Sequence, residues 1–255
     1  MITSGLHEGN CLKLLKEVPD GYVNMVLADL PYQMTQNKWD SIIPMEKLWP
    51  ELNRICVPNA VIALTASQPF TSYLVMSNPD MFKHEWIWIK NRGSNFANTV
   101  REPFKEHESV LIFSKGKWTY NRQMQPRTGG GLDRSKYNVK FETASDNYRQ
   151  FDTREENTLS ELRVPSSWQK FNTEVGLHPT QKPVSLFRYL IRTYSNKGDI
   201  ILDPCIGSGT TAIAAIEEER NWIGFENDPK YIQITQDRLN KKQSEIDPFW
   251  DILPK

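Results

Sequence analysis

The segment that most constrains the fold is a strand, a glycine-containing loop and a helix between residues 199 and 219. Ile200, Ile201 and Leu202 form an apolar strand that ends at Asp203, and Gly207-Ser208-Gly209 lead into an apolar helix at 209–219. Glycines let the backbone approach a ligand closely, and the first turn of a helix offers free N–H groups. The next strand, 221–226, ends at Glu226, whose carboxylate can accept hydrogen bonds from both hydroxyls of a ribose. The sequence therefore predicts a ligand-binding α/β fold.

Two kinds of ligand fit this loop. Gly207-x-Gly209-x-x-Ala212 matches the dinucleotide fingerprint, with Glu226 near the expected spacing. Residues 203–206, however, separate the strand from the first glycine, and no Gly-Lys-Ser/Thr of a P-loop follows. Only one clear strand comes after the loop, so N-terminal strands must complete the sheet. An adenosine-type cofactor such as S-adenosylmethionine fits this pattern better.

The rest of the chain alternates between strands and helices. Apolar runs predict strands at 23–28, 60–65, 84–89, 109–113, 199–203 and 221–226. Helices are expected at 11–17, 45–56 (disturbed at Pro50), 69–77, 209–219 and 229–241, and a further helix begins at Pro183, with Phe187, Leu190, Ile191 and Tyr194 on one apolar face. This alternation predicts a Rossmann-like, mostly parallel, doubly wound sheet with helices on both faces.

The alternation stops between residues 115 and 176. Residues 115–140 contain seven basic residues and one acid, whereas residues 142–161 contain six acids and two arginines. We therefore expect four parts: 1–114 as one half of the main domain, 115–176 as an insertion, 177–245 as the second half of the same domain, and 246–255 as a tail.

Composition narrows the function classes. Lys plus Arg and Asp plus Glu both number 31, so a wholly basic nucleic-acid binder is excluded, although a local basic surface is not. The three cysteines form no CxxC pair, so neither a disulfide framework nor a metal site is expected. The sequence shows no signal peptide and no apolar run of about 18 residues, which favours a cytoplasmic protein.

Two further motifs place polar side chains next to predicted strands or helices. Asp29-Leu30-Pro31-Tyr32 follows the apolar strand 23–28, at the strand end where ligands of parallel sheets bind. His178-Pro179-Thr180-Gln181-Lys182-Pro183 directly precedes an amphipathic helix. Taken alone, each is more typical of an ordinary strand-end turn or helix lead-in than of a functional site.

Taken together, these three motifs resemble the S-adenosylmethionine-dependent DNA amino-methyltransferases. Their order along the chain resembles the circularly permuted β group of that family, and residues 91–98 and 105–116 resemble its phage and prophage members. The resemblance implies an inserted target-recognition region at 115–176, catalysis by Asp29, Leu30, Pro31 and Tyr32, and methyl transfer from S-adenosylmethionine to the N6 amine of adenine in DNA. Tyr32 would stack on a flipped base, with Phe96 and Trp39 as further candidates.

The resemblance also assigns binding residues. The cofactor would contact Asp29, His178, Thr180, Lys182, Pro183, Asp203, Pro204, Cys205, Gly207, Ser208, Gly209, Thr210, Glu226 and Asn227. DNA contacts are expected at Arg92 and, from the charge of the insertion, at Lys115, Lys117, Arg122, Arg127, Arg134 and Lys136. Three positions depart from the family pattern: Leu30 replaces a proline, Cys205 a common phenylalanine and Asn10 a frequent aspartate.

Several alternatives stay open at this level. Cytosine-N4 methylation is the nearest, since related enzymes often have Ser in place of Asp29. A nicotinamide-dependent Rossmann oxidoreductase and an inactive DNA-binding protein are more distant, and Pro204-Cys205 offers a weak match to the nucleophile of cytosine-C5 methyltransferases. DNA is the expected partner; a homodimer and a cognate restriction endonuclease acting on the same site are compatible with the family.

Overall fold

The computed structural model describes residues 2–32, 42–128, 161–177 and 181–246. The chain divides into two compact units, one of residues 1–121 with 167–255 and one of residues 122–166. The expected insertion at 115–176 is broader than the second unit, because residues 115–121 and 167–176 group with the first.

The first unit is built on an eight-stranded sheet. Its strand order is β1 (Gly5–Glu8), β10 (Asn221–Glu226), β9 (Ile200–Asp203), β2 (Val23–Ala28), β3 (Cys56–Ala66), β5 (His107–Phe113), β4 (Phe82–Ile89) and β8 (Trp168–Lys170). All neighbours pair in parallel except β5, which is antiparallel to both β3 and β4. The predicted mostly parallel Rossmann-like sheet is confirmed.

Three strands differ from the sequence-based prediction. β5 was expected in a βαβ alternation, but the segment between β4 and β5 contains only a short 3₁₀ helix at Phe96–Asn98 and no crossover helix, so β5 returns antiparallel. β1 and β8 were not predicted, because they have only four and three residues and no apolar run. Pairing with β10 and β4 defines them.

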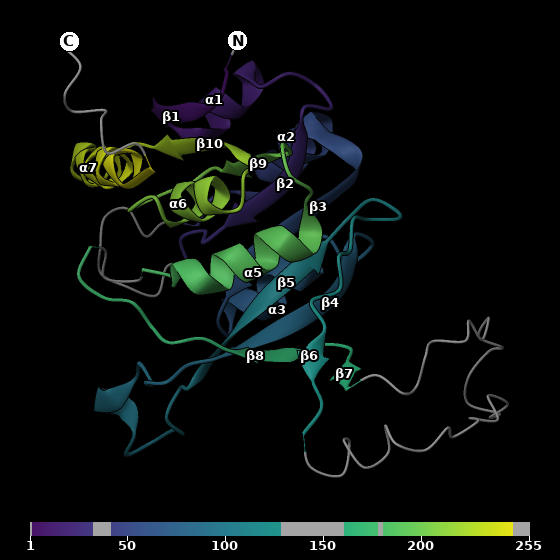
Figure 1. The fold of residues 1–255 in the computed structure, drawn as a ribbon, viewed down its shortest axis with the longest axis vertical. Coiled ribbons are helices and arrows are strands. Elements are labelled where there is room, and N and C mark those ends of the chain that lie inside the picture. Colours follow the sequence, from purple (N-terminus) through teal and green to yellow (C-terminus); the bar gives the residue numbers. More distant parts are fainter. Residues whose placement is uncertain (1, 33–41, 129–160, 178–180, 247–255) are drawn as a thin grey trace, which may run out of the picture. The chain divides into compact units, whose positions relative to one another are not determined.

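Helices cover both faces of the sheet. On one face lie α1 (Cys11–Leu14), which continues into a 3₁₀ turn at Leu15–Glu17, α2 (Met45–Ile55) and α3 (Phe70–Ser77). On the other face lies α5 (Val184–Tyr194), which packs against α6 (Thr210–Glu217) (Figure 1). The last helix, α7 (Pro229–Ile246), contacts α6, β1 and β10. Helix α2 runs through Pro50 as one element, so the expected disturbance there is not observed.

Strand β2 shows why the fold is doubly wound. Val26 and Ala28 belong to the apolar cluster under α2, whereas Met25 and Leu27 belong to the cluster under α5. Successive strand residues point to opposite faces, so a continuous apolar run is buried on both sides. The strand therefore places the residue that follows it, Asp29, at the middle of one sheet edge.

In the second unit, β6 (Gln125–Pro126) pairs antiparallel with β7 (Leu162–Arg163). The Arg127 amide adds a hydrogen bond of 2.8 Å to the Glu161 carbonyl. Within the described ranges of the whole chain, no helix combines the length and apolarity that a membrane span requires.

Candidate active site

The candidate site lies along the edge of the sheet where the parallel strands end. Asp29 follows β2, Asp203 ends β9 and Glu226 ends β10. Because β5 is antiparallel, its first residues lie at this same edge, and they bring Glu108 beside the end of β4. Acidic side chains from four strands therefore share one edge.

Asp29 is held through both carboxylate oxygens. Oδ1 accepts a hydrogen bond from the Thr65 hydroxyl and lies 2.6 Å from the Tyr32 hydroxyl. Oδ2 lies 2.6 Å from the Lys182 ammonium nitrogen. The Asp-Leu-Pro-Tyr motif is thus joined to the segment before α5.

Tyr32 is fixed on the same carboxylate. Its ring stacks on Phe70 with 4.9 Å between centroids and 29° between planes, and Lys182 Nζ lies 5.6 Å from the ring centroid. Burial, followed by the charges of Asp29 and Glu108, raises the Tyr32 pKa well above its usual value. Tyr32 is therefore a neutral hydrogen-bonding group with one ring face occupied by Phe70.

Lys182 and Glu108 extend this arrangement away from Asp29. Glu108 Oε2 lies 3.4 Å from Lys182 Nζ, and its other oxygen accepts a hydrogen bond from Lys90. Burial favours the neutral form of Lys182, but Asp29 and Glu108 outweigh it and raise the Lys182 pKa. Burial likewise favours neutral Glu108, but Lys182 and Lys90 lower its pKa. Both groups are held in their charged forms.

The glycine loop, residues 203–210, joins β9 to α6. Gly207 and Gly209 have φ angles of +53° and +81°, a conformation that glycine adopts at little cost. Thr235 on α7 donates to the Gly207 carbonyl at 2.7 Å, and Arg238 donates to the Ser208 carbonyl at 3.0 Å. Helix α7 thereby holds the carbonyls of the loop and fixes its conformation.

Glu226 caps the loop from the neighbouring strand. One oxygen accepts from the Gly207 amide at 3.0 Å, and the other from the Asn227 and Asp228 amides at 2.8 and 2.9 Å. Three backbone donors fix the orientation of this carboxylate. A half-buried carboxylate in this position retains lone pairs that can accept from ligand hydroxyls.

Asp203 is the most buried of these acids. It accepts from the Thr211 hydroxyl and, at 3.0 Å, from the Cys205 amide. Burial raises its pKa from 3.8 to about 7, with contributions from the charges of Asp29 and Glu226. Three acids that repel one another at one edge suit a ligand with positive charge.

Cys205 lies beside Cys11. A hydrogen bond that the Cys205 thiol donates to Cys11, together with burial, raises the Cys205 pKa well above its ordinary value, which keeps Cys205 a protonated thiol. A nucleophilic cysteine requires the thiolate form. The structure therefore gives no support to the cytosine-C5 alternative at Pro204-Cys205.

The remaining predicted residues have different locations. Leu30 and Pro204 are buried, Pro183 is buried before α5, and Thr210 contacts the Lys182 carbonyl at 3.3 Å. Arg92 follows β4 at the candidate edge. Lys115 and Lys117 follow β5 and therefore lie at the opposite edge, where Lys115 contacts the Asn53 carbonyl. Arg122 and Arg127 belong to the second unit, whereas Trp39, Arg134, Lys136, His178 and Thr180 lie outside the described residues.

Sequence analysis missed three members of the site. Thr65 contacts Asp29, Glu108 contacts Lys182, and Lys90 contacts Glu108, but none of the three was predicted. A usable signal was present: Lys90 directly follows the apolar strand 86–89, and Glu108 directly precedes the apolar strand 109–113. Charged residues next to strands buried on both faces are candidates for a sheet-edge site.

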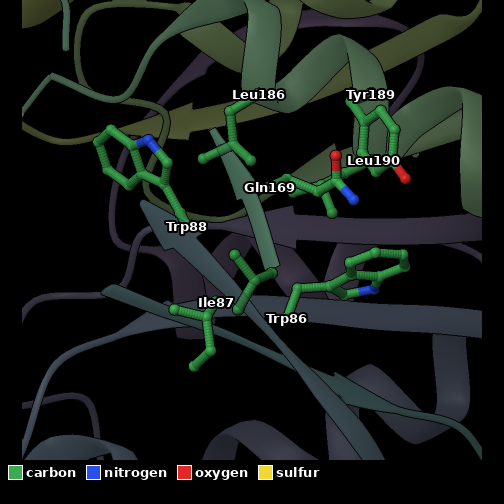
Figure 2. A pocket seen from close by; sticks show the side chains of 8 residues that line it. Trp86, Ile87, Trp88, Gln169, Leu186, Tyr189 and Leu190 are labelled. Atoms are coloured by element: carbon green, nitrogen blue, oxygen red, sulfur yellow. The ribbon is translucent and has the colours of Figure 1, made fainter. Parts of the chain in front are cut away.

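An apolar pocket lies apart from the candidate active site. Figure 2 shows it between α5 and the strands β4, β5 and β8, lined by Trp86, Ile87, Trp88, Val110, Gln169, Leu186, Tyr189 and Leu190. Asp29, Asp203 and Glu226 do not line it. Its lining belongs mainly to the apolar cluster under α5, so it is a packing gap of the core.

Comparisons with known proteins agree with the motifs. The model of the DNA methylase family for N6 and N4 methyltransferases matches residues 23–237. The Type II methyltransferase M.HpaI of Haemophilus parainfluenzae is 25% identical over 253 residues, which cover 93% of this chain and 74% of M.HpaI. M1.MboII of Moraxella bovis is 28% identical over 257 residues, covering 92% of this chain and 96% of M1.MboII.

Solved structures show the same fold. The M1.HpyAVI–SAM complex has a TM-score of 0.62 and 24% identity, covering 92% of this chain and 98% of M1.HpyAVI. The cytosine-N4-specific PvuII DNA methyltransferase has a TM-score of 0.63 and 16% identity, covering 98% of this chain and 93% of the PvuII enzyme. The family match decides against the oxidoreductase alternative. This chain belongs to the DNA methylase family of N6 and N4 amino-methyltransferases.

Proposed function

We propose that this protein transfers a methyl group from S-adenosylmethionine to the N6 amine of adenine at a specific DNA site. The observation that carries the proposal is the placement of Asp29 at the end of β2, on the same sheet edge as the glycine loop and Glu226. A hydrogen-bond acceptor for an amine and a binding loop for the methyl donor then lie on one surface.

The residues of the edge fit S-adenosylmethionine. Glu226 is oriented by three amides and can accept from ribose hydroxyls, and the turn at Gly207 and Gly209 lets the backbone approach the ligand. The acids Asp29, Asp203 and Glu226 interact unfavourably with one another, and a cationic ligand relieves that repulsion. When bound, this cofactor supplies an electrophilic methyl group on a sulfonium.

Asp29 can assist the amine during transfer. The lone pair of an exocyclic amine is delocalised into the ring, so the nitrogen is a weak nucleophile. Acceptance of its N–H bonds by the Asp29 carboxylate and by the carbonyl of Leu30 or Pro31 favours a tetrahedral nitrogen as positive charge develops there. The excess proton then leaves to Asp29 or to water.

The target base must leave the duplex to reach this carboxylate, at a cost of a few kcal/mol. Residues 91–106, between β4 and β5, begin beside the site and expose Phe96 and Val100 to 83% and 86%. The same segment carries Arg92, Arg101 and Lys105. An apolar tip flanked by arginines supports a role for this segment, with Tyr32, in holding DNA around an extruded base.

Target recognition is assigned to the insertion. Its basic residues, including Arg122 and Arg127, are suited to phosphate contacts, which contribute affinity rather than sequence specificity. The Type II names of the relatives support pairing with a restriction endonuclease of the same DNA specificity. A homodimer belongs to the same proposal, and light scattering of the purified protein tests it.

Adenine is favoured over cytosine by Asp29, since cytosine-N4 enzymes often have Ser at this position. The test expresses the chain in a host free of DNA methylation that grows on methyl-deuterated methionine, and digests the genomic DNA to nucleosides for mass spectrometry. Deuterated methyl groups in N6-methyladenine support the proposal. Label in N4-methylcytosine assigns the base to cytosine, and the absence of label from all nucleosides contradicts DNA methylation by this chain.

A further inference from the structure

Four charged side chains of alternating sign form a row that ends at Asp29; we call Lys90, Glu108, Lys182 and Asp29 the charge row. Lys182 Nζ lies 2.6 Å from Asp29 Oδ2 and 3.4 Å from Glu108 Oε2, and Glu108 Oε1 accepts from Lys90. The two lysine side chains are each 6% exposed, Glu108 is 16% exposed and Asp29 is 23% exposed. The row therefore runs from the interior to the partly open catalytic carboxylate.

Stability alone is a poor explanation for this row. Removing charges from water is costly, and well-packed apolar residues often replace buried ion pairs without loss of stability. The Trp88 ring lies beneath Lys90, with 5.1 Å between Nζ and the ring centroid, and this cation–π contact offsets only part of the cost of burying the charge. Buried, paired charges beside a reactive group are typical of functional sites.

The topology explains how the row forms. Lys90 follows β4, Glu108 lies near the start of β5, and Lys182 precedes α5. The antiparallel direction of β5 brings Glu108 next to Lys90 and to the edge that holds Asp29. A parallel β5 would place Glu108 at the far edge, with no path to Lys182.

The hydrogen bonds of Asp29 indicate what the row does. A carboxylate offers about four acceptor positions. Among the described residues, Thr65 and Tyr32 contact Oδ1 and Lys182 contacts Oδ2, so Oδ2 is the less occupied oxygen. Lys182 thus fixes the rotation of the carboxylate while it leaves part of Oδ2 for an incoming amine.

We propose that Lys182 is a positioning residue for Asp29, held in place by Glu108 and, through Glu108, by Lys90. This inference rests on the proposed function, in which Asp29 accepts the target amine. It replaces the sequence-based assignment of Lys182 to cofactor binding. Glu108 and Lys90 then contribute to methyl transfer without touching either substrate.

The test measures the kcat for methyl transfer at saturating DNA and S-adenosylmethionine, and the cofactor Kd by calorimetry. Lys182→Met removes the charge and keeps the chain length. We expect kcat to fall by ~10²-fold or more, the usual cost of one preorganised group, with the Kd within about threefold of wild type. The matched control is Lys197→Met, at an ion pair whose side chains are 69% and 67% exposed, which should leave kcat unchanged.

A double-variant cycle tests the rest of the row. Glu108→Gln leaves two lysines against one acid, and Lys90→Met leaves Glu108 free to draw Lys182 away from Asp29, so each should lower kcat by about tenfold. Combining them leaves the balanced pair Asp29–Lys182. The double variant should therefore be more active than either single variant.

The outcomes separate the hypotheses. Strictly multiplicative losses in the cycle, or a Lys182→Met protein with wild-type kcat, would overturn the inference. If Lys182→Met binds S-adenosylmethionine more weakly but reaches the wild-type kcat at saturating cofactor, Lys182 belongs to the cofactor site and the inference is overturned. If Lys182→Met does not fold by circular dichroism, Lys182→Arg keeps the charge with a wider head and should lower kcat at unchanged Kd. A wild-type protein that methylates no DNA contradicts the proposed function itself, whereas an active wild type with unaffected variants contradicts only this inference.

Discussion

Gly209 and Thr235 are in contact across the glycine loop and α7, and the contact leaves no room for a β-carbon. A β-carbon on Gly209 would lie 2.9 Å from the Thr235 methyl carbon, and the φ angle of Gly209 is +81°. Two independent constraints, backbone conformation and steric space, therefore require glycine at the N-cap of α6.

Gly209→Ala should lower both stability and cofactor affinity. The left-handed backbone alone costs ~1–2 kcal/mol with a side chain, and the displaced Thr235 adds to it. Gly198→Ala is a matched control, because Gly198 has a φ of +82° but no atom within 4 Å of its β-carbon position. Urea denaturation should show a larger loss for Gly209→Ala, and calorimetry should show weaker S-adenosylmethionine binding only for that variant. Equal losses in both variants would mean that Thr235 adjusts freely.

Glu226 should determine the affinity for S-adenosylmethionine. Glu226→Ala removes the acceptor for the ribose hydroxyls and should weaken binding by about 1.5–3 kcal/mol, the range for a hydrogen bond to a charged group. Glu226→Gln keeps one carbonyl acceptor for the loop amides and should lose less. Calorimetry on both folded variants checks this, and unchanged affinity in Glu226→Ala would remove Glu226 from the cofactor site.

Asp29 should be essential for turnover but not for reaching the folded state. Asp29→Ala removes one of the acidic partners of the buried Lys182, so the protein should still fold but with a lower thermal transition, whereas kcat should fall by at least ~10²-fold. Asp29→Asn is the matched variant, because it keeps the shape and loses the charge beside Lys182. A methylation assay with labelled cofactor measures the turnover of both variants. Near-normal turnover in Asp29→Ala would contradict the proposed mechanism.

The pH dependence of stability should contain a contribution from Asp203. Its pKa rises from 3.8 to about 7 in the folded state, so the folded protein binds more protons than the unfolded protein between these values. Stability from this group is therefore fully present below pH ~4 and is lost as pH rises through about 7. Asp203→Asn should flatten that decline by an amount of order a few kcal/mol.

Urea denaturation from pH 5 to 8.5 measures this slope. Asp80→Asn, at an exposed aspartate, serves as the control and should leave the slope unchanged. A slope in Asp203→Asn identical to that of wild type would show that Asp203 titrates normally.

Basic residues of the insertion should contribute to DNA binding. Reversing Arg122 and Arg127 to Glu should lower DNA affinity and flatten its salt dependence, by roughly 0.9 in slope for each phosphate that the protein no longer neutralises. Lys115→Glu with Lys117→Glu gives the same change in net charge at the edge opposite Asp29, and we expect a smaller effect. Fluorescence anisotropy at several salt concentrations compares the two pairs. Equal effects would indicate a response to net charge alone.

The sequence by itself determined most of the local structure and the family. The apolar runs at 23–28 and 221–226 became β2 and β10 with the same bounds, and the helix with Phe187, Leu190 and Tyr194 on its apolar face is buried as predicted. These features depend on neighbouring residues and on periodicity, which the chain carries locally. The three motifs likewise indicated the family, since each is a contiguous segment.

Only the tertiary structure decided which charges meet. Glu108 and Lys90 join Lys182 and Asp29 because β5 runs antiparallel between β3 and β4, and the same reversal carries Lys115 to the opposite edge. Strand direction and order arise from pairing between segments far apart in the chain, and Asp29 and Lys182 likewise meet across a sequence separation of 153. Residue periodicity indicates which faces are buried, but it does not specify the neighbour or the direction of a strand, so the full row of charges could be seen only after folding.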